Sequence, residues 1–140
     1  MKLSTLLKDV EILNTYEDVE VERVTDNDKD NLKNALYVCI DGNHVDGHSL
    51  AKNALKQGAV AVLTSSDLAI PNKIIVRNTR CAYSEIAANF YGNPAKQLKL
   101  IGVTGTNGKT STSFFIKEML ESLGKKCGII GTVKNATGNR

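Results

Sequence analysis

Residues 100–111 read Leu-Ile-Gly-Val-Thr-Gly-Thr-Asn-Gly-Lys-Thr-Ser. An apolar run, a glycine-rich turn and a Lys-Thr pair that opens an amphipathic segment form the pattern of a strand, a phosphate-binding loop and a helix. Glycines allow the tight curl that turns backbone N–H groups toward phosphate oxygens, and the helix start adds unpaired donors. This stretch therefore predicts an α/β fold that binds a nucleotide.

Each part of the loop has an expected task in holding ATP. Lys109 brings a mobile positive charge to the β and γ phosphates, so we expect it to be catalytic, and the hydroxyl of Thr110 suits Mg²⁺. The strict P-loop pattern has glycine where this chain has Val103, so the loop is a variant. The glycine spacing does not fit the dinucleotide fingerprint either. The expected ATP contacts are Gly105, Thr106, Asn107, Gly108, Lys109, Thr110 and Ser111.

Hydrophobic periodicity on both sides of the loop predicts alternating helices and strands. Helices are expected over residues 3–9, 49–57, 79–91 and 108–123, and strands over 19–24, 36–40, 59–63, 74–76, 98–103 and 127–130. Short connections between alternating elements indicate an α/β class with a largely parallel sheet. Gly, Asn and Pro cluster between Gly92 and Gln97, which predicts one domain over residues 1–95 and the start of another over 96–140.

Composition excludes several classes of protein. The 140 residues carry 18 basic and 15 acidic side chains, and a net charge of +3 is too small and too evenly spread for a nucleic-acid binder. Apolar runs are too short for a transmembrane helix. Three widely spaced cysteines are interpreted as free, buried thiols of a cytoplasmic protein. His44 and His48 have a glycine between them and no third ligand, which argues against a zinc site.

The loop from Thr104 to Ser111 resembles the ATP-binding loop of the Mur ligase family, ATP-dependent enzymes that form amide bonds in peptidoglycan precursors. The lead-in Phe-Tyr-Gly-Asn-Pro at 90–94 and the segment 128–133 resemble the group that adds the third residue of the stem peptide. The sibling group that adds D-alanyl-D-alanine usually has serine in place of Thr106, and it stays an alternative.

Residues 41–48, Asp-Gly-Asn-His-Val-Asp-Gly-His, are similar to the uridine-binding N-terminal domain of the same family. The resemblance implies that the UDP-muramoyl peptide contacts Thr25, Asn27, Asn43, His44 and Val45. Asp28 stands where the family usually has arginine, so a phosphate contact there is not expected. Asn27 can still donate and accept hydrogen bonds in place of the family's serine.

By this resemblance, ATP and Mg²⁺ serve the addition of meso-diaminopimelate or L-lysine to UDP-N-acetylmuramoyl-L-alanyl-D-glutamate through an acyl phosphate. The pathway supports cell wall biogenesis, cell shape and division. We find no acidic residue after a later strand for Mg²⁺ and no amino-acid-selecting domain, so the chain is expected to be an N-terminal part of the ligase and inactive alone. A stand-alone, non-catalytic nucleotide-binding module is the alternative from another class.

Overall fold

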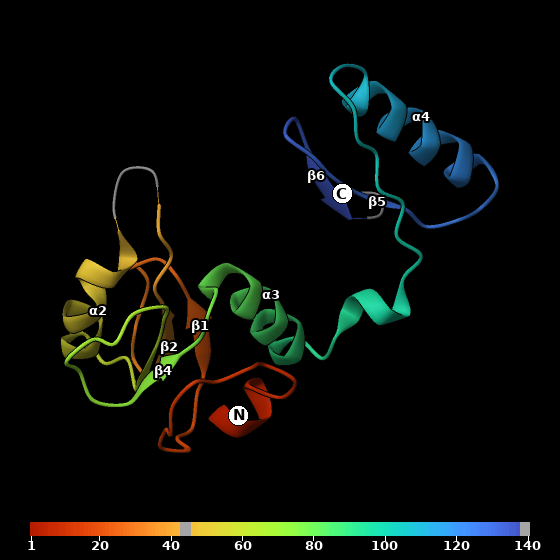
Figure 1. Ribbon diagram of the computed structural model, residues 1–140. Helices are drawn as coiled ribbons and strands as arrows, with labels where there is room; N and C mark the ends of the chain where they lie inside the picture. The colour runs from red at the N-terminus through yellow and green to blue at the C-terminus, as the bar shows by residue number, and fades with distance from the viewer. Residues whose placement is uncertain (43–45, 138–140) are drawn as a thin grey trace. The chain divides into compact units, whose positions relative to one another are not determined.

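The computed structural model describes residues 1–42 and 46–137. The chain divides into two compact units, Met1–Leu98 and Lys99–Arg140 (Figure 1). The first unit is a four-stranded sheet with helices, and the second is a helix with a short hairpin.

All four strands of the first unit are parallel and lie in sequence order. They are β1 (Arg23–Thr25), β2 (Ala35–Val38), β3 (Ala61–Thr64) and β4 (Lys73–Ile75). The register pairs Leu36 of β2 with Ala61 of β3. The predicted α/β class with a parallel sheet is confirmed.

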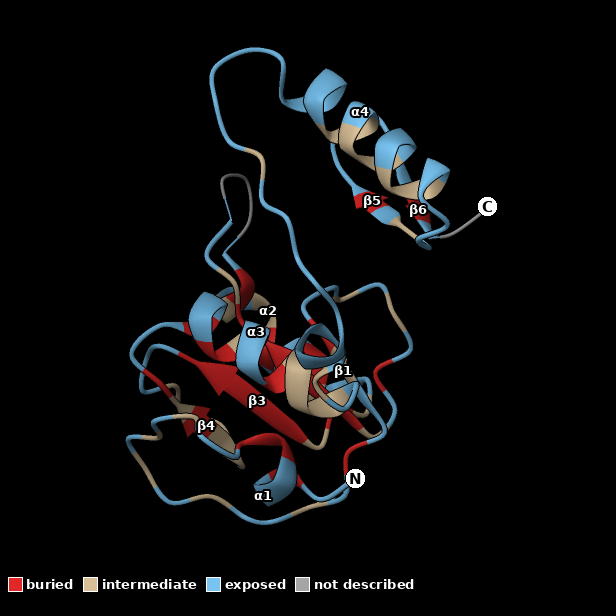
Figure 2. Cartoon of the chain, turned by 90° about the vertical axis from the view of Figure 1, so that its right-hand side faces the viewer, coloured by how far each residue is buried: buried red, intermediate tan, exposed pale blue. Residues whose placement is uncertain are grey.

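Side chains of the central strands β2 and β3 alternate between two apolar cores. Leu36 and Val38 of β2 pack with α1 (Leu3–Leu6) and α3 (Thr79–Phe90). Ala35 and Tyr37 pack on the other face, beneath α2 (Gly47–Lys56). Every residue of β2 and β3 is buried, as Figure 2 shows for β3. Strands covered on both faces are expected to be apolar along their whole length, as these are.

The edges of the sheet differ from the sequence prediction. The strand expected over 19–24 forms β1 only in its last residues, because residues 19–21 pair with the chain start: the N–H of Leu3 donates to the Val19 carbonyl at 2.9 Å. The helix expected over 3–9 is limited to α1. On the opposite edge, the Asn14 amide accepts from the Ile75 N–H at 2.6 Å and donates to the Lys73 carbonyl at 2.9 Å, so it covers the free edge of β4.

The second unit contains α4 (Lys109–Ser122), and β5 (Gly128–Ile130) pairs antiparallel with β6 (Asn135–Thr137). The short 3-10 helix η1 (Pro94–Gln97) precedes this unit. The prediction of a strand over 98–103 is wrong, since these residues form no strand in the structure. A strand needs a backbone partner, and β5 uses its ladder with β6, an element that the sequence analysis missed. The helix prediction over 108–123 is confirmed.

Tyr37 supplies a test of the core. Its side chain is fully buried, and its hydroxyl has no hydrogen-bond partner within the described residues. A buried hydroxyl left unpaired costs about 1–3 kcal/mol, so Tyr37→Phe should raise the free energy of unfolding at pH 7 by about 1 kcal/mol in urea titrations. Tyr91→Phe, at a residue that is 74% exposed, should change nothing. A clearly destabilised Tyr37→Phe variant would refute this account.

The buried Tyr37 phenol should also make the free energy of unfolding depend on pH in the alkaline range. Burial raises the pKa of Tyr37 from 10.0 to about 12, because the charged phenolate is poorly solvated in the core. The folded state therefore keeps this proton longer than the unfolded state. Ionisation of Tyr37 in the unfolded state therefore leaves the free energy of unfolding unchanged below pH 10 and lowers it as the pH rises toward 12. Urea titrations at pH 9 to 12 should show a shallower loss of stability in Tyr37→Phe than in the wild type.

Candidate functional site

The glycine-rich loop of the second unit curls in the way the sequence predicts. Gly105 has φ 152° and Gly108 has φ 75°. Residues that carry a side chain rarely adopt either of these backbone conformations. The Lys109 ammonium donates to the Gly105 carbonyl at 2.6 Å and to the Thr106 carbonyl at 3.3 Å. The charge of Lys109 is therefore directed back over the loop, toward the region where the loop would hold phosphate oxygens.

The start of α4 differs from the starts of the other two long helices. Asp46 caps α2 by accepting from the His48 N–H, and Asn78 caps α3 by accepting from the Cys81 N–H. Gly108 precedes α4 in a left-handed conformation, and no side chain of the described residues caps this helix. The first N–H groups of a helix have no partner within it, so those of α4 are free to bind an anion.

The carboxyl ends of the four parallel strands in the first unit share one edge of the sheet. Ligands of open α/β sheets bind at this edge. Thr25 ends β1, Asp41 follows β2, Ser65 follows β3 and Arg77 follows β4. The edge thus gathers polar residues from four separate parts of the chain.

At the end of β1, two of the expected substrate residues are joined by a carboxylate. Asp30 accepts from the Thr25 hydroxyl at 2.6 Å and from the Asn27 side-chain amide at 3.0 Å. The Asn27 backbone N–H also donates to the Thr25 hydroxyl. The structure therefore brings Thr25 and Asn27 together, with Thr25 buried and Asn27 exposed. Sequence reasoning missed Asp30, although an acid three residues after Asn27 in a turn is a signal for such a bond.

The connection from β2 to α2 is fixed at both ends. Asp41 and Asp46 form an antiparallel bridge, and the Gly47 N–H donates to the Ile40 carbonyl at 2.9 Å. The guanidinium of Arg80, at the start of α3, donates to the Asp41 carbonyl at 2.6 Å. The other expected substrate residues, Asn43, His44 and Val45, lie outside the described residues.

His48 joins the start of α2 to the end of β3. Its ring Nδ1 lies 2.6 Å from the Asp46 carboxylate, and its Nε2 lies 3.0 Å from the Ser65 hydroxyl and 3.2 Å from the Ser65 N–H. The backbone N–H of His48, and then its ring, hold the pKa of the Asp46 carboxyl below its usual value. The helix expected over 49–57 begins two residues earlier, at Gly47, because Asp46 caps it, so His48 lies in its first turn.

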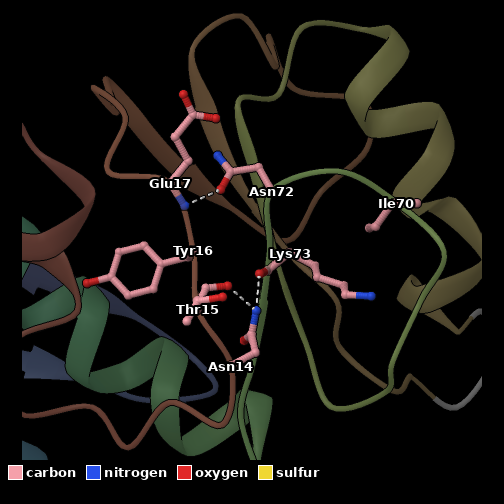
Figure 3. A pocket seen from close by; sticks show the side chains of 7 residues that line it. All are labelled: Asn14, Thr15, Tyr16, Glu17, Ile70, Asn72 and Lys73. Carbon is pink, nitrogen blue, oxygen red and sulfur yellow. Dashed lines mark hydrogen bonds between the residues drawn. The ribbon is translucent and has the colours of Figure 1, made fainter.

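A shallow cavity lies elsewhere in the first unit, where β4 begins (Figure 3). Its polar side chains are occupied with each other and with nearby backbone: the Asn14 amide bonds the Lys73 carbonyl, and the Asn72 side chain accepts from the Glu17 N–H at 3.2 Å. None of the expected site residues lines it. The lining residues are Asn14, Thr15, Tyr16, Glu17, Ile70, Asn72 and Lys73.

The His, Cys and acidic side chains of the described residues can be compared with the arrangements that hold metal ions. Residues 1–42 and 46–137 contain no group of three or more His, Cys, Asp or Glu side chains arranged to hold a metal ion. The three cysteines are free, as expected, but only Cys39 is buried, while Cys81 is exposed and Cys127 half-buried. Burial raises the pKa of Cys39 to about 12, so its thiol is unreactive. No helix within the described ranges is both long and apolar enough to cross a membrane.

Comparison with known proteins gives matches on both units. The model described as "Mur ligase family, catalytic domain" matches residues 32–91, and the "Mur ligase middle domain" matches residues 103–140. A UDP-N-acetylmuramoyl-L-alanyl-D-glutamate--2,6-diaminopimelate ligase from Alkaliphilus metalliredigens is 38% identical over 99% of this chain and 29% of its own length. The enzyme of the same name from Clostridium perfringens is 39% identical over the whole chain and 30% of its length.

The chain therefore spans about 30% of the length of the curated relatives that it matches. Among solved structures, a crystal structure of MurF from Acinetobacter baumannii has a TM-score of 0.63 and 19% identity, over 86% of this chain and 27% of that one. A similarity at this level of identity shows the shared fold alone.

Gly47 at the start of α2 packs closely against the backbone of Cys39 and Ile40. A Cβ at this position would lie 2.7 Å from the Ile40 nitrogen and 3.2 Å from the Cys39 Cα, both of which are backbone atoms that cannot move aside. Gly47→Ala should therefore lower the free energy of unfolding by about 1–3 kcal/mol, measured by urea titration. Gly102→Ala is the matched control, because its Cβ would meet no described atom within 4 Å. Equal stability of the two variants would contradict the close approach.

Proposed function

The chain belongs to the Mur ligase family, and from this premise we propose that it forms the N-terminal part of an ATP-dependent ligase that adds 2,6-diaminopimelate to UDP-N-acetylmuramoyl-L-alanyl-D-glutamate. The observation that carries the proposal is the 38% identity to a ligase of that name across 99% of this chain, through both structural units. The relatives are about three times longer, so we propose that the 140 residues bind ligands but do not ligate alone.

In this proposal residues 1–95 bind the UDP-linked substrate and residues 96–140 begin the ATP-binding domain. The carboxyl edge of the parallel sheet is the expected ligand position, and it carries Thr25 and Asn27. Asn43, His44 and Val45 belong to the same proposed site by family resemblance. The Asp30 carboxylate orients the Thr25 hydroxyl and the Asn27 amide, so these groups are already positioned before a ligand binds.

The backbone geometry of the loop Gly105–Ser111 suits the phosphates of a nucleoside triphosphate. Two glycines in left-handed conformations and an open helix start offer backbone N–H groups, and Lys109 adds a full charge beside them. The Thr110 hydroxyl is the proposed ligand of Mg²⁺, which when bound neutralises charge on the phosphates. The protein's own contribution to phosphoryl transfer is positioning and charge neutralisation by Lys109 and the α4 N-terminus.

The relatives named above favour 2,6-diaminopimelate over L-lysine as the added residue, because both carry it in their names at 38% and 39% identity. The sibling reaction, addition of D-alanyl-D-alanine, is the second candidate. A solved relative titled as a D-alanyl-D-alanyl ligase from Acinetobacter baumannii has a TM-score of 0.60 but only 19% identity. We propose a cytoplasmic role in peptidoglycan precursor synthesis, without nucleic-acid or membrane partners.

The substrate-binding proposal is tested by isothermal titration of the 140-residue chain with UDP and with UDP-N-acetylmuramoyl-L-alanyl-D-glutamate. We expect saturable binding of both, with the sugar-peptide conjugate bound more tightly. Adenosine diphosphate at the same concentration controls for binding by the other unit. Absence of uridine-nucleotide binding at millimolar ligand would refute the proposed role of the first unit.

The role of the loop is tested with Lys109→Ala in the whole ligase. Removal of the charge that faces the phosphates should lower the ligation rate at least about a hundredfold, while the Kd for the UDP-linked substrate stays nearly the same. Lys126→Ala is the matched control, because Lys126 is an exposed lysine of the same unit, outside the loop. Normal turnover by Lys109→Ala would show that the loop does not act as proposed.

A further inference from the structure

The outer edge of the sheet at β4 is closed by a short segment of the chain, residues 13–17, which we call the strap (Figure 3). β4 is the last strand in the order of the sheet, so it pairs with β3 on one side only. The Asn72 carbonyl and the Val76 N–H bond to β3, and alternate residues of a strand direct their backbone groups to opposite sides. The backbone groups of Lys73 and Ile75 therefore point away from β3, toward the strap.

Three of these outward-facing backbone groups form hydrogen bonds with the strap. The Leu13 N–H donates to the Ile75 carbonyl at 2.8 Å. The Asn14 side chain makes the other two bonds: its amide oxygen accepts from the Ile75 N–H at 2.6 Å, and its amide nitrogen donates to the Lys73 carbonyl at 2.9 Å. A single asparagine side chain thus bonds both outward-facing residues of β4.

The chemistry of the Asn14 amide explains why it fits this edge. A primary amide carries the same pair of groups as a peptide unit, an N–H donor and a carbonyl acceptor. Asn14 presents both to β4 as a neighbouring strand would, although residues 13–17 form no strand themselves. An open sheet edge is a template for pairing with another chain, and the strap satisfies this edge without adding a further strand.

We propose that Asn14 prevents β4 from pairing edge to edge with β4 of a second copy of this chain. A copy related by a two-fold axis presents the same backbone groups, so the two strands can pair antiparallel and need no other partner. The net charge of +3 gives little repulsion between copies. The Lys73 ammonium at this edge is paired with the Asp67 carboxylate, so its charge does not protect the edge either.

The strap is held by contacts on both sides of Asn14. The Glu17 N–H donates to the Asn72 side chain at 3.2 Å, and Ile12 and Tyr16 pack against the apolar core. Loss of the Asn14 amide should therefore leave the first unit folded. It removes the partners of the Ile75 N–H and the Lys73 carbonyl, and only the Leu13 N–H then ties the strap to the strand itself.

Two variants at position 14 separate loss of the bonds from opening of the edge. Asn14→Ala removes both groups of the amide. Asn14→Asp keeps an acceptor for the Ile75 N–H and places a negative charge at the edge, which repels the same charge on a second copy. Thr15→Ala is the matched control, because Thr15 is an exposed residue of the strap whose side chain takes no part in these bonds.

Sedimentation velocity of the 140-residue chain measures self-association from micromolar to millimolar concentration, and the thermal midpoint shows that each variant is folded. We expect Asn14→Ala to associate at least about tenfold more strongly than wild type, with Asn14→Asp and Thr15→Ala unchanged. A folded Asn14→Ala variant that sediments as wild type does, or an Asn14→Asp variant that associates equally, would overturn the inference. Asn14→Ser is also too short to bond both backbone groups, and it repeats the test if Asn14→Ala is unfolded at the assay temperature.

Hydrogen exchange of the Ile75 N–H locates the surface of association. In dilute Asn14→Ala this group should exchange at least about tenfold faster than in wild type, because its acceptor is gone. At millimolar concentration a second copy should supply a new acceptor, so the exchange should slow again in this variant alone. Association without this renewed protection would mean that the copies meet at another surface, which would overturn the inference.

Discussion

The parallel pairing of β2 with β3, buried on both faces, is the constraint on which the first unit depends. Leu36 and Val38 face one core while Ala35 and Tyr37 face the other, so a shift of the register by one residue would exchange both cores at once. This double burial requires helices on both faces, and α2 and α3 supply them. It also places the carboxyl ends of all four strands at one edge, which Thr25 reaches as the last residue of β1 and Ser65 as the first residue after β3.

Side-chain hydrogen bonds hold that edge. Asp30 joins Thr25 at the end of β1 to Asn27 in the turn that follows, Arg80 at the start of α3 holds the Asp41 carbonyl after β2, and His48 joins α2 to the end of β3. Each tie satisfies a polar group that the end of a strand leaves open, so the contacts stabilise the fold and order the site together.

The sequence predicted what is encoded locally. Periodicity located β2, β3, β4, α2 and α3 of the first unit. The glycine-rich loop was identified from its residue types, and Gly105 and Gly108 do have positive φ. Three features were missed because they depend on contacts that form only in the folded chain. Residues 19–21 pair with the chain start, residues 98–103 form no strand, and Asp30 lies close to Thr25 only after the turn forms. An apolar, β-branched pattern shows that a segment prefers the extended conformation, but it forms a strand only where a second segment pairs with its backbone.

The two units show this contrast most clearly at their helix starts. The loop before α4 is specified by conformations that glycine alone adopts easily, so a short motif is enough to identify it. The start of α2 depends on a cap at Asp46, on a glycine that fits against the Ile40 backbone, and on a histidine bonded to Ser65. Only the first two of these are local in the sequence. A glycine-rich loop can therefore be recognised from eight residues, whereas the contact that joins the start of α2 to the end of β3 has to be found in the folded chain.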